Sequence, residues 1–234
     1  MEFSFKDAYL YNWQELYYFE LENDMCLDAF HILNNNIENS LKSTKQEFTK
    51  LIDQDSFLSN LNENDKSNYY SQIYYREELA LLNLQRLQRY SLCLSLFSFF
   101  EGRLKSICSS LELEFHLKKK VKELAAPDDL SKYWDYLDKV FKMKMNTFKI
   151  EFSIIKKIKL VRNLVAHNEG FLDKRMKNRL DSIIGISFTE IENRYRIEIA
   201  ENIFIDFLLS QMSFCLSKIS ISINNRCKDI TIKN

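Results

Sequence analysis

The stretch LCLSLFSFFEGRLKSIC, residues 92–108, decides the fold, because it is apolar on more sides than a surface helix can be. It lies inside a leucine-rich segment that we predict to be one long helix over residues 69–113. The apolar run 92–100 is too short to cross a bilayer, which takes about 20 residues. We therefore expect this helix to be the central, buried helix of the protein.

Apolar residues at three-to-four spacing predict further helices on both sides of this segment. Only one proline, Pro127, and three glycines interrupt the 234 residues, which favours long helices. The segment between 53 and 66 is polar and rich in turn residues, and it predicts a loop. The other predicted helices are 13–53 (as one helix or two consecutive ones), 130–141, 147–167 and 201–219.

One segment changes period. In ISFTEIENRYRIEIA, residues 186–200, apolar and polar side chains alternate on both sides of Glu192 and Asn193, which predicts a β-hairpin with its turn there. We therefore predict a mainly α fold, a helical bundle with long antiparallel helices and a small hairpin insert near 186–199. Residues 1–234 form a single domain in this prediction, with an N-terminal helical extension at 1–66 and a core at 69–219.

The net charge of zero hides an asymmetry along the chain. Residues 1–78 hold 6 basic and 15 acidic side chains, a balance of −9, whereas residues 118–179 hold 17 basic and 8 acidic, a balance of +9. A basic segment of this kind can attract a polyanion, or it can neutralise the acidic segment within one fold. The sequence leaves both interpretations open.

The five cysteines are scattered, without a CxxC or a Cys/His ligand spacing, so a zinc site is not expected. An odd number of scattered cysteines fits a reducing cytosol. The beginning of the chain, MEFSFKDAYL, lacks the basic-then-apolar pattern of a secretion signal. We therefore expect a cytoplasmic protein with no membrane partner.

The stretch VRNLVAHNEG, residues 161–170, ends the predicted helix 147–167 with unusual polar side chains. Gly170 falls where a left-handed cap residue would stop the helix. The apolar stripe of this helix is predicted to consist of Ile154, Ile158, Val161 and Val165. Three polar side chains flank that stripe, and they are Arg162, Asn163 and His167.

The chemistry of these three residues suits an anion. Asn163 and His167 are four apart and so are neighbours on a helix, while Arg162 lies on the other side of the stripe. A guanidinium matches phosphate oxygens, and an imidazole transfers protons near neutral pH. The alternatives are ordinary: a histidine that caps the helix, an asparagine with a local partner, and an arginine paired with a carboxylate.

The motif R-N-x-x-x-H at the end of a late helix resembles the signature of the HEPN superfamily. LFSFFEGRLKSIC, residues 96–108, resembles the glutamate-bearing central helix of several bacterial HEPN groups, and the hairpin followed by a final helix is similar to their layout. The resemblance covers roughly residues 69–219, with the RN…H motif as its sharp part.

The resemblance implies a metal-independent endoribonuclease without a cofactor, acting in phage defence or in a toxin–antitoxin system. Arg162 would bind and polarise the scissile phosphate, and His167 would act as general acid or base. Asn163 would orient the histidine or bond a phosphate oxygen, and the 2′-hydroxyl of the RNA would attack. The implied partners are RNA, a second copy that completes a composite cleft, and an antitoxin or companion defence protein. A toxin subgroup carries a modifiable tyrosine two residues after the histidine, where this chain has Glu169, so neutralisation by that route is not expected.

Glu101 lies inside the apolar run, and a buried carboxylate needs a partner. We predict that it pairs with Arg162 or with another cation near the cleft, as a supporting residue; the alternative is that it is simply solvated. For the whole chain, the alternative is a non-catalytic HEPN-type module for dimerisation or protein interaction. A weaker third possibility is a nucleotide-binding regulatory domain.

Overall fold

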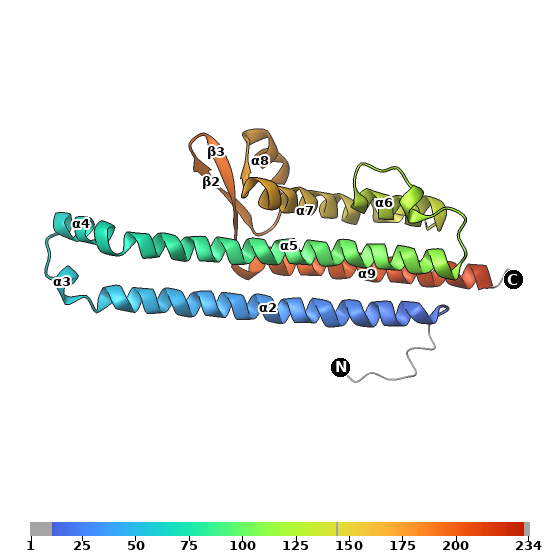
Figure 1. The fold of residues 1–234 in the computed structure, drawn as a ribbon, viewed down its shortest axis with the longest axis horizontal. Coiled ribbons are helices and arrows are strands. Elements are labelled where there is room, and N and C mark those ends of the chain that lie inside the picture. Colours follow the sequence, from blue (N-terminus) through green and yellow to red (C-terminus); the bar gives the residue numbers. More distant parts are fainter. Residues whose placement is uncertain (1–10, 144, 232–234) are drawn as a thin grey trace.

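The computed structural model describes residues 11–143 and 145–231, and two helices of 40 residues each dominate it. Helix α2 (Gln14–Asp53) and helix α5 (Tyr75–Glu114) run antiparallel along the longest dimension of the molecule (Figure 1). At about 1.5 Å per residue, each is roughly 60 Å long. The mainly α prediction is confirmed, together with the long antiparallel helices.

The tip that joins these two helices differs from the predicted loop. Residues 53–66 contain the short helix α3 (Ser56–Ser59) and the beginning of α4 (Glu63–Ile73). Asp55 and Asn62 cap these helices with their side chains, accepting backbone N–H groups of the first turn. Polar residues that we assigned to a loop therefore act as N-caps, and the predicted helix 69–113 is divided near Tyr74.

Two further helices pack against this pair. Helix α9 (Glu201–Thr231) lies along α2 and α5, and helix α7 (Lys149–Asn168) packs against α5 and α9. In Figure 1, α7 covers α5 from the side opposite to α2. Fully buried side chains come from all of these helices, and they include Leu16, Phe97, Phe100, Ile158 and Phe204.

Helix α9 is longer than predicted, and its stretch Glu201–Lys228 is long and apolar enough to pass as a membrane span by length and composition alone. Half of its most apolar window is buried against the rest of the protein. Its buried side chains include Phe204, Leu208, Met212 and Ile219. Its apolar face thus serves the core of the bundle.

The expectation of a buried central helix holds only for half of α5. Between Tyr90 and Leu111 its apolar side chains are buried, whereas Leu79, Leu82, Leu84 and Leu87 are all exposed. The reason is visible in Figure 1: α2 and α5 extend beyond the end of α9, so this part of the hairpin has no third helix over it. We call this part of α2 and α5, with the short helices α3 and α4 between them, the distal arm (residues 39–88).

The connection between α5 and α7 is irregular. The predicted helix 130–141 is observed as α6 (Asp129–Asp135), which continues as a π-helical turn (Tyr136–Val140). Two 3₁₀ turns, Val121–Glu123 and Met145–Phe148, complete the segment. The stacked rings of Trp134 and Phe152, 3.8 Å between centroids, hold α6 against α7.

The predicted hairpin is present. Strands β2 (Ile186–Ile191) and β3 (Arg194–Ile199) pair antiparallel, and Glu192 and Asn193 form the turn with φ values of 47° and 65°. Two consecutive positive φ values are typical of a type I′ turn, whose twist matches that of a hairpin. A third strand, β1 (Phe171–Leu172), pairs with β3, giving the order β1-β3-β2. Strand β1 and the short helix α8 (Lys174–Leu180) that follows it were not predicted from the sequence.

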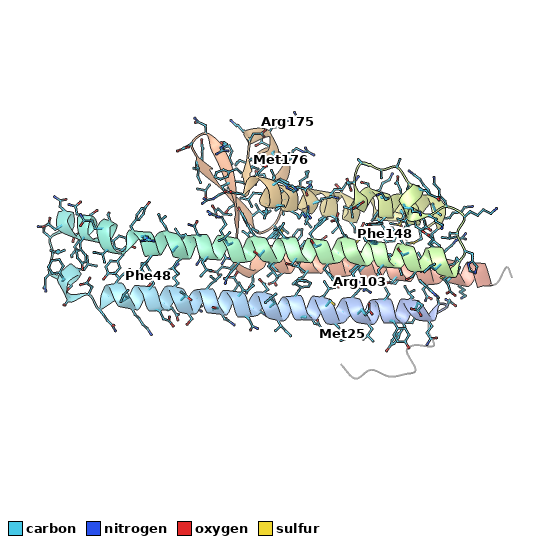
Figure 2. The ribbon with its side chains drawn as sticks, in the orientation of Figure 1. Met25, Phe48, Arg103, Phe148, Arg175 and Met176 are labelled. Atoms are coloured by element: carbon cyan, nitrogen blue, oxygen red, sulfur yellow. The ribbon has the colours of Figure 1, made fainter. Side chains whose placement is uncertain are left out.

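Two arginines of α5 hold the long helices together. Arg89 forms two 2.7 Å bonds with the carboxylate of Glu38 on α2 and a third, 2.9 Å, with the carbonyl of Ile199 in β3. Arg103, labelled in Figure 2, bonds Glu22 and Asn23 of α2. Bidentate arginine–carboxylate pairs are strong when shielded from water, and Arg89 and Glu38 are only 13% and 11% exposed.

Only glycine fits at position 170, where α7 ends, for two reasons. Its φ is +80°, and a Cβ atom there would overlap the hydroxyl of Tyr90. That hydroxyl is itself fixed, since it donates a 2.6 Å hydrogen bond to the carbonyl of Ile197. The residue before it, Glu169, is also left-handed, with φ 52°. The predicted cap is thus a two-residue left-handed turn pressed against α5.

Replacing Gly170 with alanine should lower the free energy of unfolding by about 1–3 kcal/mol, because the new methyl group meets Tyr90 and the positive φ becomes strained. Gly102→Ala is the matched control: it lies within α5 with nothing within 4 Å of the new Cβ. That change should raise stability by about 0.5–1 kcal/mol. Urea unfolding measures both. Equal stability of Gly170→Ala and the wild type would contradict the described contact.

Candidate functional site

Helix α7 carries the predicted site, and its buried face sets the direction of every other side chain on it. The fully buried residues are Ile155, Ile158, Val161 and Val165. The predicted stripe began at Ile154, which is only half-buried; Ile155 occupies the core position instead. The stripe is therefore correct in its last three members and wrong by one residue in the first.

A lysine one turn before the motif fastens α7 to its neighbours. The ammonium of Lys159 lies 2.9 Å from Glu101 on α5 and 3.0 Å from Asp128 at the start of α6. Lys159 and Glu101 are 16% and 21% exposed. Glu101 thus pairs with a cation next to the motif, as one of the two predicted alternatives, and that cation is Lys159 rather than Arg162. The simply solvated alternative does not describe it.

Asp128 has two roles in this cluster. It is the N-cap of α6, accepting the backbone N–H of Ser131 at 2.9 Å, and it also binds Lys159. Burial by itself would raise the pKa of this carboxyl, but the hydrogen bond from Ser131 and the contact with Lys159 together lower it below its ordinary value. The carboxylate therefore stays charged at neutral pH and keeps Lys159 in place.

Arg162 is half-buried. Its Nη1 donates a 3.1 Å hydrogen bond to the side-chain oxygen of Asn163, and its Nε is buried without a partner among the described residues. The Cys93 thiol is close enough to feel its charge: burial raises the pKa of Cys93 to about 12, and Arg162 acts in the opposite direction. Because that thiol is neutral, it does not compensate the guanidinium.

His167 lies in the last turn of α7 and is exposed. It makes no hydrogen bond or ion pair with any of the described residues. The carbonyl of Leu164 accepts the backbone N–H groups of Glu169 and Gly170, so the backbone itself closes the helix end. The alternative of a capping histidine therefore finds no support in this geometry.

A groove of about 880 Å³ runs along the solvent side of α7. Its walls come from the start of α6, from α7 and from the end of α8 with the turn after it. Residues Lys156, Lys157, Leu160 and Asn163 line it from α7, and Asn178, Arg179 and Ser182 line it from the other side. We call this feature the α7 groove.

Of the predicted site, Asn163 lies on the wall of the α7 groove, whereas Arg162 and His167 are not among its lining residues. His167 is four residues beyond Asn163 on the same side of the helix, and Arg162 reaches Asn163 through its hydrogen bond. Asn163 therefore contacts Arg162 directly and is the helical neighbour of His167. No hydrogen bond joins it to His167 in the described part of the chain.

The positions of Lys156, Lys157, Lys159 and Arg179 at the groove were not predicted from the sequence. The three lysines lie close together in KKIK, residues 156–159, so the sequence did contain a signal of a basic cluster on this helix. Arg179 and Asp128 carried no such signal, because α8 and the start of α6 reach α7 only through the tertiary fold. Within residues 11–143 and 145–231, no group of three or more His, Cys, Asp or Glu side chains is placed to hold a metal ion.

The chain matches no family model, no curated protein and no solved structure. What it shows by itself is a mainly helical protein with a small antiparallel sheet and a polar, lysine-lined groove along its motif helix.

We expect Lys159 and Glu101 to be energetically coupled. A double-mutant cycle with Lys159→Met and Glu101→Gln should give an interaction energy of about 0.5–3 kcal/mol, because both groups are largely shielded from water. The control is the pair Lys139 and Asp135, which is 62% and 34% exposed and should give roughly 0.3–0.5 kcal/mol. Equal coupling in the two cycles would remove the structural role of Lys159.

The lowered pKa of Asp128 predicts a pH dependence. A carboxyl whose folded pKa lies below its unfolded value stabilises the fold above the unfolded pKa, and that contribution is lost as the pH falls through the folded pKa. Asp128→Asn should therefore be less stable than the wild type near neutral pH. The difference should shrink below the ordinary pKa of 3.8. Urea midpoints of both proteins between neutral pH and about pH 3 measure it, and a difference that grows in acid would contradict the assignment.

Proposed function

We propose that this chain is an endoribonuclease of the HEPN type that cleaves RNA by attack of the 2′-hydroxyl, without a cofactor. One arrangement carries the proposal: Asn163, held by Arg162, lies on the wall of a cation-lined groove, and the exposed His167 follows one turn later on the same side. This arrangement and the motif R-N-x-x-x-H together favour a shared phosphate-binding site. The alternative is that the three polar residues have separate, unrelated roles.

In the proposed reaction, the 2′-oxygen bonds to phosphorus and the bond from phosphorus to the 5′-oxygen breaks. The products are a 2′,3′-cyclic phosphate and a 5′-hydroxyl. His167 takes the proton from the 2′-hydroxyl or gives one to the departing 5′-oxygen, since an imidazole can do either near neutral pH. The other of these two protons is exchanged with water. Proton transfer of this kind contributes about 10²–10⁴ to a rate.

Arg162 would stabilise the charge that develops on the phosphate oxygens. Two observations fit this role: its Nε is buried and has no partner among the described residues, and its Nη1 is held only by a neutral amide. A phosphate that displaced the Asn163 oxygen would replace a neutral acceptor of the guanidinium with an anionic one. The Asn163 amide would then be able to bond a phosphate oxygen or to orient His167.

The proposed setting is cytoplasmic, in phage defence or in a toxin–antitoxin system. The proposed partners are RNA, a second copy of the chain whose motif helix completes a composite cleft, and an antitoxin or companion defence protein. Buried thiols such as Cys93, Cys108 and Cys215 are compatible with a reducing compartment.

Purified protein incubated with mixed RNAs in EDTA should produce 2′,3′-cyclic phosphate ends. His167→Ala and Arg162→Ala should each reduce the cleavage rate at least about 100-fold. The matched controls are His31→Ala and Arg76→Ala, which remove the same residue types from α2 and α5. Cleavage that survives both motif substitutions would place the activity elsewhere, and no cleavage at all by the wild type would favour the alternative below.

The second candidate is a non-catalytic module that dimerises or binds a protein. The exposed apolar side chains of the distal arm favour it, since Leu82 and Leu87 are 54% and 59% exposed. In that case Arg162 and Asn163 would stabilise an interface. A dimer by light scattering that is lost on Arg162→Ala, in a protein without nuclease activity, would support this candidate over the first.

A further inference from the structure

Two sets of cations in the described chain differ in their partners. Arg89, Arg103, Lys159 and Lys218 each contact a carboxylate between elements of the fold. The cations that line the α7 groove, other than Lys159, contact no carboxylate within the described residues. This second group consists of Lys156, Lys157 and Arg179.

The contacts of this second group are all to neutral atoms. Lys157 bonds the hydroxyl of Ser182 at 2.9 Å, and the ammonium of Lys156 lies 4.4 Å from the centre of the Phe152 ring. Arg179 is exposed. The one carboxylate in the groove, Asp128, is already bound by Lys159 and Ser131. The groove therefore carries positive charge that nothing in the described chain neutralises.

We propose that the α7 groove is the binding track for the phosphates of a single RNA strand next to the cleaved linkage, with Lys156 and Arg179 as the principal phosphate contacts. This rests on the proposed nuclease function, and it assigns the part of the substrate that the cleavage residues do not touch. Lys159 is excluded from the track, because Glu101 and Asp128 hold its ammonium.

The helix geometry connects the track with the cleavage residues. Ser153, Lys156, Leu160, Asn163 and His167 recur every three or four residues, so they lie along one face of α7. From Lys156 to His167 the helix rises about 16 Å, at about 1.5 Å per residue. A strand that follows this face passes the cations first, then Asn163, and reaches the exposed imidazole at the helix end.

The shape of the groove favours a single strand over a duplex. It is a concave space walled by α6, α7 and α8, and a duplex presents a convex surface that contacts a protein across its grooves. Single strands enter basic grooves that follow the backbone. The lining has serines, asparagines and Leu160 but no aromatic side chain on which a base could stack, so the track reads phosphates and has little preference among bases.

The test is the salt dependence of binding by the full chain. A fluorescent, fully 2′-O-methylated oligonucleotide lacks the attacking hydroxyl, so fluorescence anisotropy reports binding without cleavage. For the double variant Lys156→Gln/Arg179→Gln, we expect Kd to rise about tenfold or more. The slope of log K against log salt should become shallower by about 1.4, at about 0.7 per lost phosphate contact with a single strand.

The control variant is Lys45→Gln/Lys50→Gln, which removes the same charge from exposed positions of α2 on either side of Phe48, at the distal arm (Figure 2). It should leave both Kd and the slope unchanged. Oligo-U and oligo-A should bind within about threefold of each other. Thermal melting confirms that each variant is folded.

Three results would overturn the track. They are an unchanged slope in the groove variant, equal or tighter binding of duplex RNA, and displacement of the oligonucleotide by a mononucleotide at equal phosphate concentration. The last would identify a nucleotide pocket. Failure of the track and failure of the nuclease proposal are separable: RNA cleavage with an unchanged slope removes only the track, and a shallower slope without cleavage by the wild type removes only the nuclease.

Discussion

The attachment of α7 to α5 and α6 by Lys159 is the constraint on which the candidate site depends. A single ammonium joins a carboxylate from the central helix to the N-cap carboxylate of α6. Two acidic groups this close would repel each other without the cation between them, and the partial burial of the cluster makes the loss of any member costly. The same contacts restrict the rotation of α7, and in this orientation Asn163 lies on the wall of the groove.

The remaining framework is held by arginines of α5 that work in the same way. Arg89 connects α2, α5 and β3 by three hydrogen bonds, and Tyr90 next to it bonds β3 and presses against the turn that ends α7. The sheet and the end of the motif helix are thus anchored at one place on α5. Beyond that place toward the tip, the distal arm continues without cover, which is why leucines that look like core residues are exposed there.

Two sets of cations in the described chain differ in what their side chains contact. Those between elements are neutralised by carboxylates and act as fasteners, whereas those in the α7 groove face solvent beside neutral groups. Asn163 lines the groove and accepts a hydrogen bond from Arg162, whose Nε has no hydrogen-bond partner among the described residues. An anion is the ligand that such a surface can bind with the smallest rearrangement.

Local periodicity in the sequence was enough for the helices, the hairpin with its Glu192–Asn193 turn and the stop at Gly170, because each follows from residues within a few positions of one another. It also placed Asn163 and His167 on one side of a helix. The register of the buried stripe was wrong at Ile154, since neighbouring isoleucines at 154 and 155 fit the same period. Only the tertiary structure decided that Glu101 pairs with Lys159 and that Arg179 lines a groove along α7. Those contacts join segments far apart in the chain, and their partners are chosen by how whole helices pack, which no local pattern of residues records.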